Sequence, residues 1–216
     1  MPSLDVVIVV VYLFTLAYVG YQAWNNMEDR AAMVLDQAFL NQQLVEQGLD
    51  QAIALKIPLK PQYGFEPIAD LSLTLVNTSS APIYVDWDRC SLTNFSGRSR
   101  RVVRVTPSMN LDLSRPQVFS VVSPGNALTE KVIAEDMLKP GEGGALTIVA
   151  PLVDLKPLGG LPEDKRLEFA LRLVLRRVTE NPYHNEDDLN YHSITCRFSA
   201  RRVPWDENFP WRKPKK

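Results

Sequence analysis

A long apolar run near the start of the chain, Val6 to Trp24, constrains the fold most strongly. About twenty residues from Leu4 to Ala23 are nearly all apolar, and a helix of that length, rising about 1.5 Å per residue, matches the ~30 Å hydrocarbon core of a bilayer. A helix also satisfies its own backbone hydrogen bonds in lipid. Tyr18, Tyr21 and Trp24 lie toward one end, as aromatic residues do at a membrane interface. The run therefore predicts a transmembrane anchor over residues 1–24.

Two alternatives to an uncleaved anchor are a cleaved signal peptide and a buried core helix. A signal peptide has a basic first segment, a shorter apolar core and small residues at its cleavage site. Here no Lys or Arg precedes Val6, whereas Arg30, Lys56 and Lys60 follow the helix. We expect an uncleaved, single-pass membrane protein, and the distribution of basic residues favours the cytoplasmic side for its soluble part.

The segment after the anchor, residues 25–56, has the composition of a helix, because it is rich in Ala, Leu, Gln and Glu and lacks proline. We predict a helical stalk that presents Leu35 and Phe39 to a partner. Its candidate seam follows the alternating three and four spacing of a coiled coil, at Ala31, Leu35, Ala38, Gln42, Val45, Leu49 and Ala52. Small or polar seam residues and Gly48 count against self-association, so a helix lying on a partner or on its own domain is the favoured alternative.

From Pro58 the period of the sequence changes from helical to two, which is typical of strands. The clearest strand has Leu167, Phe169, Leu171, Leu173 and Leu175 on one face and Glu168, Arg172 and Arg176 on the other. About nine short strands separated by turn residues predict a mainly β fold, an immunoglobulin-like antiparallel β-sandwich over residues 57–203. Besides residues 71–75 and 83–87, the expected strands are 89–95, 100–105, 117–122, 127–133, 145–151, 167–178 and 191–203.

Two cysteines, Cys90 and Cys196, lie within expected strands. In an oxidising compartment they would bridge two sheets, as in immunoglobulin domains. Two small buried thiols are the other interpretation, since free cysteine is among the most buried residue types.

Several short motifs resemble those of an uncharacterised family of bacterial membrane and envelope proteins with an immunoglobulin-like β-sandwich. The matching segments are Leu71-Ser-Leu-Thr-Leu-Val-Asn-Thr, Ile83-Tyr-Val-Asp-Trp-Asp-Arg-Cys-Ser-Leu, Gly97-Arg-Ser-Arg-Arg-Val, Val122-Ser-Pro-Gly and Leu138-Lys-Pro-Gly. That family often carries a lipoprotein signal, in place of which this chain has an apolar helix, a stalk and an aromatic, basic tail. The resemblance implies a fold and an envelope setting, and it implies no activity.

The sequence contains few candidates for catalytic residues. His184 and His192, with acidic residues between them, are a candidate metal pair, although a polar hairpin connection is the simpler interpretation. A nucleophile elbow, a phosphate-binding loop and paired Cys-x-x-Cys motifs are absent from the sequence. We expect no enzyme, no cofactor and no metal.

Basic residues indicate a possible binding partner only where they cluster, and not through the overall charge of the chain. The chain has 24 basic and 25 acidic residues, a balance that does not favour nucleic acid. A cluster of Arg98, Arg100, Arg101 and Arg104 is either a phosphate or headgroup site or, more simply, a solvated strand face.

The last segment, residues 204–216, combines aromatic and basic residues. Trp205, Phe209 and Trp211 need a surface to bury against, either their own domain or a neighbouring subunit, and with Arg212 they form the predicted partner-binding tail. Its terminal Lys and Arg residues would also suit anionic lipid.

These features lead to a non-enzymatic, single-pass membrane protein that acts as an accessory or assembly subunit of a larger membrane complex through protein–protein contacts. The alternatives are an envelope sensor or ligand-binding module that self-associates through the stalk, and a metal-dependent hydrolase that uses the His184 and His192 loop.

Overall fold

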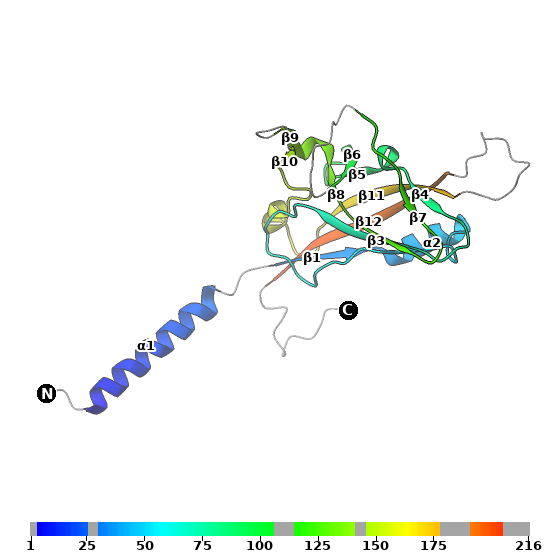
Figure 1. Ribbon diagram of the computed structural model, residues 1–216. Helices are drawn as coiled ribbons and strands as arrows, with labels where there is room; N and C mark the ends of the chain where they lie inside the picture. Colours follow the sequence, from blue (N-terminus) through cyan, green and yellow to red (C-terminus); the bar gives the residue numbers. More distant parts are fainter. Residues whose placement is uncertain (1–3, 26–29, 106–114, 141–145, 178–190, 205–216) are drawn as a thin grey trace, which may run out of the picture.

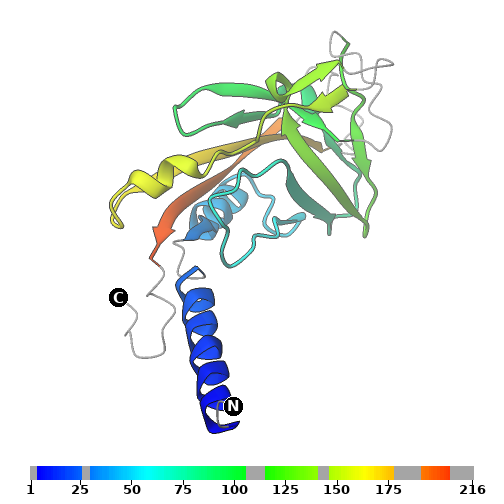
Figure 2. The ribbon, with the colours of Figure 1, turned by 90° about the vertical axis from the view of Figure 1, so that its left-hand side faces the viewer.

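A computed structural model describes residues 4–25, 30–105, 115–140, 146–177 and 191–204. Helix α1 (Leu4–Asn25) extends away from a β-rich domain (Figures 1 and 2). Its side chains from Leu4 to Gln22 are all exposed, and this stretch is long and apolar enough to span a membrane. The structure is therefore consistent in both length and exposure with the predicted N-terminal membrane helix.

The domain is one curled antiparallel sheet with a small second sheet. Pairing follows the order β1-β12-β11-β5-β6-β8-β3-β2, β4 pairs with β11 and β7, and β9 pairs with β10. The strands are β1 (Arg30–Leu35), β2 (Ile53–Lys56), β3 (Leu71–Asn77), β4 (Ile83–Val85), β5 (Ser91–Thr93), β6 (Ser99–Arg104), β7 (Ser120–Val122), β8 (Ala127–Ala134), β9 (Leu138–Pro140), β10 (Leu146–Ile148), β11 (Arg166–Arg177) and β12 (Tyr191–Val203).

The curl depends on β6, whose two halves pair with different strands. Residues 99–101 pair with β5, whereas residues 102–104 pair with β8. The sheet therefore bends along β6 and encloses one apolar core (Figure 2). Phe198 of β12 lies in this core and stacks on Phe169 of β11, with ring centroids 4.6 Å apart.

The mainly β, antiparallel prediction is confirmed, and every strand predicted after residue 70 is present, four of the nine with shorter bounds than predicted. Four leucine and phenylalanine side chains predicted to share the inner face of β11 are buried: Phe169, Leu171, Leu173 and Leu175. The immunoglobulin-like arrangement is not confirmed, because continuous pairing connects β1 to β2 within one curled sheet.

The predicted helical stalk is wrong over the described part of residues 25–56. Residues 30–56 form β1, helix α2 (Gln37–Glu46) and β2, which belong to the domain. Three residues of the proposed seam, Ala31, Leu49 and Ala52, are buried in the core of this domain, whereas Val45 is 63% exposed. Tertiary packing here overrides the helical propensity of the segment.

Helix α2 begins and ends at recognisable caps. The Asp36 carboxylate accepts a hydrogen bond from the N–H of Phe39 at the first turn. At the other end Gly48 has a φ of 64°, and the N–H groups of Gly48 and Leu49 donate to the carbonyls of Val45 and Leu44. This is the hydrogen-bond pattern of a Schellman motif, and it stops the helix where the stalk was expected to continue.

Helix α2 lies against the part of β12 that β1 does not reach, since β1 pairs only with residues 198–203. Gln43 acts as a strand substitute there: its Nε2 donates to the Thr195 carbonyl at 2.8 Å and its Oε1 accepts from the Thr195 N–H at 3.0 Å. One turn later Gln47 donates to the Ser193 carbonyl at 2.9 Å. The helix thus satisfies backbone groups on an otherwise open sheet edge.

Candidate functional site

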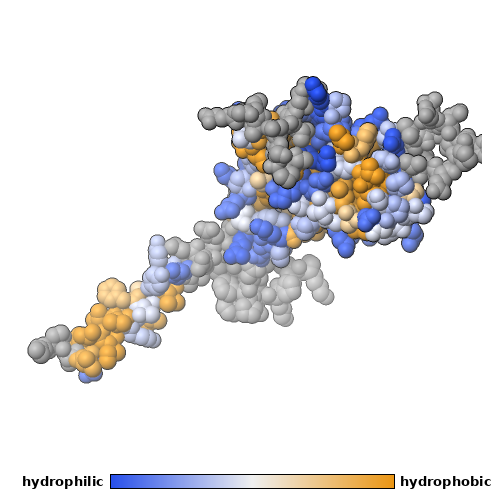
Figure 3. All heavy atoms as spheres, viewed as in Figure 1, coloured by the Kyte–Doolittle hydropathy of each residue, from blue (hydrophilic) through white to orange (hydrophobic). Residues whose placement is uncertain are grey.

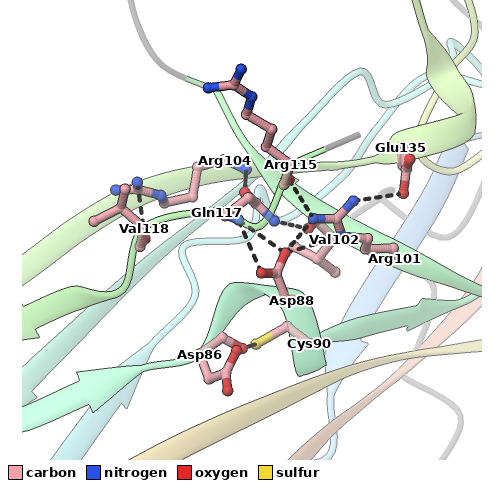
Figure 4. A network of polar contacts seen from close by, with 10 residues as sticks. All are labelled: Asp86, Asp88, Cys90, Arg101, Val102, Arg104, Arg115, Gln117, Val118 and Glu135. Atoms are coloured by element: carbon pink, nitrogen blue, oxygen red, sulfur yellow. Dashed lines mark hydrogen bonds and ion pairs between the residues drawn. The ribbon is translucent and has the colours of Figure 1, made fainter. Parts of the chain in front are cut away.

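An extended polar cluster is formed by an arginine network on β6 (Figure 4). Asp88 lies on a short 3-10 helix (Trp87–Arg89) and accepts from the Arg101 guanidinium, through both Nε and Nη2. Glu135 lies 3.5 Å from Nη1 of the same arginine. Asp88 also accepts from the backbone N–H of Gln117 at 2.9 Å. One carboxylate therefore joins β6 to the segment that leads into β7.

Gln117 completes this junction with its buried side chain. Its Nε2 donates to the Val102 carbonyl at 2.8 Å, and its Oε1 accepts from the Arg104 N–H at 3.1 Å. Like Gln43, this glutamine pairs with a strand backbone as a neighbouring strand would. The loop before β7 is consequently held against β6.

The protonation of the network follows from its contacts. Burial by itself would raise the pKa of Asp88, but hydrogen bonds from Arg101 and from the Gln117 N–H, together with the Arg101 charge, lower this pKa below its ordinary 3.8. The hydrogen bond to Asp88 is also the main reason that the pKa of Arg101 is raised. The pair is ionised at neutral pH.

Two further arginines of the cluster also have carboxylate partners. Arg100 lies 3.2 Å from Asp136, and Arg104 lies 3.3 Å from Glu130. Arg104 also donates to Ser120 Oγ at 2.9 Å. These contacts argue against an open phosphate site, because each of the three guanidinium groups is engaged with a carboxylate from another element. The interpretation as a strand face balanced by acidic residues elsewhere agrees with these ion pairs, although the three arginine side chains are largely buried rather than solvated.

The predicted partner-binding residues fall into two groups. Trp205, Phe209, Trp211 and Arg212 lie outside the described residues. Leu35 is half-buried against the core and pairs with Phe198, while Phe39 is half-buried with the Arg197 guanidinium carbon 3.7 Å from its ring centroid. Leu35 and Phe39 thus contact their own domain rather than forming a stalk surface.

His192 lies on β12 opposite Leu175, and its predicted metal partner His184 is outside the described residues. Burial and then the Arg177 charge lower the pKa of His192. Within the described ranges no group of three or more His, Cys, Asp and Glu residues is arranged to hold a metal.

The cysteines are free and buried, so the disulfide interpretation is wrong and the buried-thiol interpretation is confirmed. Burial raises the pKa of Cys90, and of Cys196, to about 12. The Sγ atom of Cys90 lies 3.1 Å from the Asp86 carbonyl and 3.4 Å from the Val174 N–H. Both side chains have the environment of structural rather than reactive thiols.

A surface that sequence reasoning missed crosses four strands in one row. Val121 of β7 is opposite Tyr84 of β4, Tyr84 is opposite Arg176 of β11, and Arg176 is opposite Tyr191 of β12. All four side chains lie on the outer face, opposite to the buried Leu175 and Val85. The alternation of β11 indicated that Arg176 faces outward, but its neighbours depend on strand register, which the sequence does not show.

Comparison with protein-family models, with curated proteins and with solved structures gives no match to this chain.

Proposed function

We propose that this chain is a non-enzymatic, single-pass membrane protein that acts as an accessory or assembly subunit of a larger membrane complex. The observation that carries the proposal is the pairing of Arg30 with Val203 between the first and last strands. The first of these residues follows α1, and the second precedes the predicted partner-binding tail.

The covalent geometry of the chain limits the distance between the end of α1 and the start of β1. Asn25 ends α1 and Arg30 begins β1, so their Cα atoms lie within about 18 Å of each other even with a fully extended linker. Val203 lies opposite Arg30 at the spacing of paired strands, roughly 5 Å. A tail that starts at this point has the anchoring helix within reach, and therefore also the membrane segments of neighbouring subunits.

The residues of the tail suit such a contact. Tryptophan and arginine are frequent anchors in protein interfaces, and both occur in Pro204-Trp-Asp-Glu-Asn-Phe-Pro-Trp-Arg. We assign the soluble domain to the cytoplasmic side, where the terminal basic residues would also meet anionic lipid.

The structure makes self-association through a stalk less favourable than the subunit role. The residues proposed for a coiled-coil seam belong to β1, to α2 and to the turn between α2 and β2. Three of them, Ala31, Leu49 and Ala52, are buried within a single domain and cannot face a second copy without unfolding it.

The test is co-purification of the full chain, tagged at its N-terminus, in a mild detergent, with partners identified and quantified by mass spectrometry. We expect stoichiometric partners whose recovery falls at least tenfold when Trp205 and Trp211 are both replaced by alanine. Replacement of both by phenylalanine is the matched control and should retain most of the recovery. Recovery of the chain alone, or equal partner amounts for both double variants, would contradict the proposal.

A further inference from the structure

We propose that the row Val121, Tyr84, Arg176 and Tyr191, together with Phe119, is a docking surface for an acidic segment of a partner protein. We call these five residues the arginine–aromatic face. The inference goes beyond the proposed function, because it names a second surface, separate from the tail, and the chemistry of its occupant.

The first argument is the exposure of large side chains. Val121 is 50% exposed, Phe119 is 42% exposed and Tyr191 is 36% exposed, although they belong to or adjoin paired strands. In the view of Figure 3 apolar patches lie on both halves of the domain, one of them on the half that is farther from α1. Tyrosine, phenylalanine and arginine together are the composition that is enriched in protein interfaces.

The second argument is the state of Arg176. Its guanidinium carbon lies 4.7 Å from the ring centroid of Tyr84 and 5.5 Å from that of Phe119. Its Nε is buried and has no hydrogen-bond partner, and no carboxylate among the described residues forms an ion pair with it. The two aromatic rings hold the guanidinium in place, and none of the described carboxylates neutralises its charge.

Its neighbour Arg89 shows the contrast. Arg89 lies over the ring of Tyr191 at 4.4 Å, and its charge is matched by Asp86, 3.4 Å away. Arg176 thus differs from Arg89, and from the paired arginines of β6, in having no acidic partner within the part of the chain that the structure describes. A planar, pre-oriented guanidinium without a partner is suited to a carboxylate, which it binds through two parallel hydrogen bonds.

The chemistry of the face also discriminates among occupants. A two-fold contact between copies centred on this row would bring Arg176 against its own equivalent, which places two positive charges together. A lipid surface is also disfavoured by position. Arg166, at the other end of β11, pairs with Arg201 near the anchor, and Arg176 lies ten residues farther, roughly 33 Å along the strand.

An acidic protein segment fits both parts of the face. An Asp or Glu side chain would neutralise Arg176, and an adjacent apolar side chain would cover Val121 and Phe119. The exposed aromatic rings on either side would exclude water from the ion pair, which strengthens it.

The test is photo-crosslinking of the full chain in its native membranes, with a benzophenone amino acid in place of Val121. We expect a cross-link to another protein at a peptide that contains Asp or Glu. Arg176→Glu should reduce the yield at least fivefold, and replacement of the partner's acidic residue by lysine should restore it. Arg98→Glu, a charge reversal at an exposed arginine in the turn between β5 and β6, is the matched control and should leave the yield unchanged.

Several outcomes would overturn the inference. They are a cross-link only to lipid, to a second copy or to residues 178–190 of the same chain, an absence of cross-links, and a yield that Arg176→Glu leaves unaltered. Arg176→Gln serves as a second variant, and an unchanged unfolding midpoint shows that each variant folds. Trp205 and Trp211 are intact in the cross-linking experiment, so its outcome does not depend on the tail. If cross-linking fails while co-purification is normal, only the arginine–aromatic face is rejected. If co-purification does not depend on the tail while the cross-link is lost and rescued as expected, only the role of the tail is rejected.

Discussion

At the scale of single residues, Asp88 is the carboxylate that joins Arg101 of β6 to the segment before β7. Its carboxylate accepts hydrogen bonds from both Arg101 and the Gln117 N–H, so the negative charge fixes two elements at once. The folded state holds the pKa of Asp88 below its ordinary value, which means that the unfolded chain takes up the proton first as the pH falls. The stabilisation is therefore fully present above the unfolded pKa of about 3.9 and is lost as the pH falls through the lower folded value.

Asp88→Asn should lower the free energy of unfolding by about 1–2 kcal/mol near pH 7, because the charged hydrogen bonds are weakened. At an acid pH below the ordinary value of 3.8 the difference from the parent protein should shrink, because the parent carboxylate then also begins to take up a proton. Urea unfolding of the full chain in detergent at both pH values measures this. The exposed Asp164→Asn is the control, and an equal loss at both pH values would contradict the assigned role.

The sequence indicated the arginines of β6 but not what they do. Arg100, Arg101 and Arg104 stand out as a cluster, whereas their partners Asp136, Asp88 and Glu130 are between 13 and 36 residues away. Pairing across strands depends on register, and local spacing does not determine register. For the same reason the arginine–aromatic face was not predictable, since its row takes one residue from each of four strands.

At the scale of elements, the strands after residue 70 were predicted from the sequence and those within residues 30–56 were not, and this difference has a physical cause. Strands after residue 70 were predicted because their apolar residues alternate with polar ones. In β3, for example, the apolar residues Leu71, Leu73 and Leu75 face inward. Residues 30–56 were not predicted as strands, because their alanine and glutamine content favours a helix and only long-range packing makes β1 and β2. Gly48 was a signal in the sequence for the end of a helix near residue 47, because glycine is frequent at the C′ position that follows a helix.

Helix α2 provides a prediction at this scale. Gln43→Ala should lower the free energy of unfolding by about 1–3 kcal/mol, because it leaves the N–H and carbonyl of Thr195 without partners. Amide exchange at Thr195 should accelerate correspondingly. Gln42→Ala is a matched control on the exposed side of the same helix, where only an i,i+4 contact with Glu46 is lost, and it should cost less than about 0.5 kcal/mol. Equal effects of the two variants would show that the edge contact does not contribute.

At the scale of the whole molecule, helix α1 and the β-rich domain do not share a core. The described side chains of α1 are exposed from Leu4 to Gln22, whereas residues from Ala31 onward contribute to the core. The apolar surface of α1 is thus not covered by the described part of the domain and is long enough to span a membrane, and the sheet has its own core.

Removal of residues 1–25 should release the chain from the membrane fraction and change the free energy of unfolding of the domain by less than about 0.5 kcal/mol, as for a surface change. Alkaline carbonate extraction and urea unfolding measure the two effects. Replacement of α1 by a polyleucine helix of equal length is the control and should restore membrane association. A truncated chain that remains in the membrane fraction would contradict the anchor.

The position of β12 between β1 and β11 has a consequence for how the protein is made. Synthesis proceeds from the N-terminus, so β1 emerges first, whereas β12, with which all six residues of β1 pair, emerges last. At about 5–20 residues per second, β1 waits on the order of ten to thirty seconds for that neighbour. A ribosome that stops before Tyr191 therefore releases a chain that lacks an interior strand of the sheet. A stop codon shortly before Tyr191 should abolish the fold as completely as one near the start of the domain.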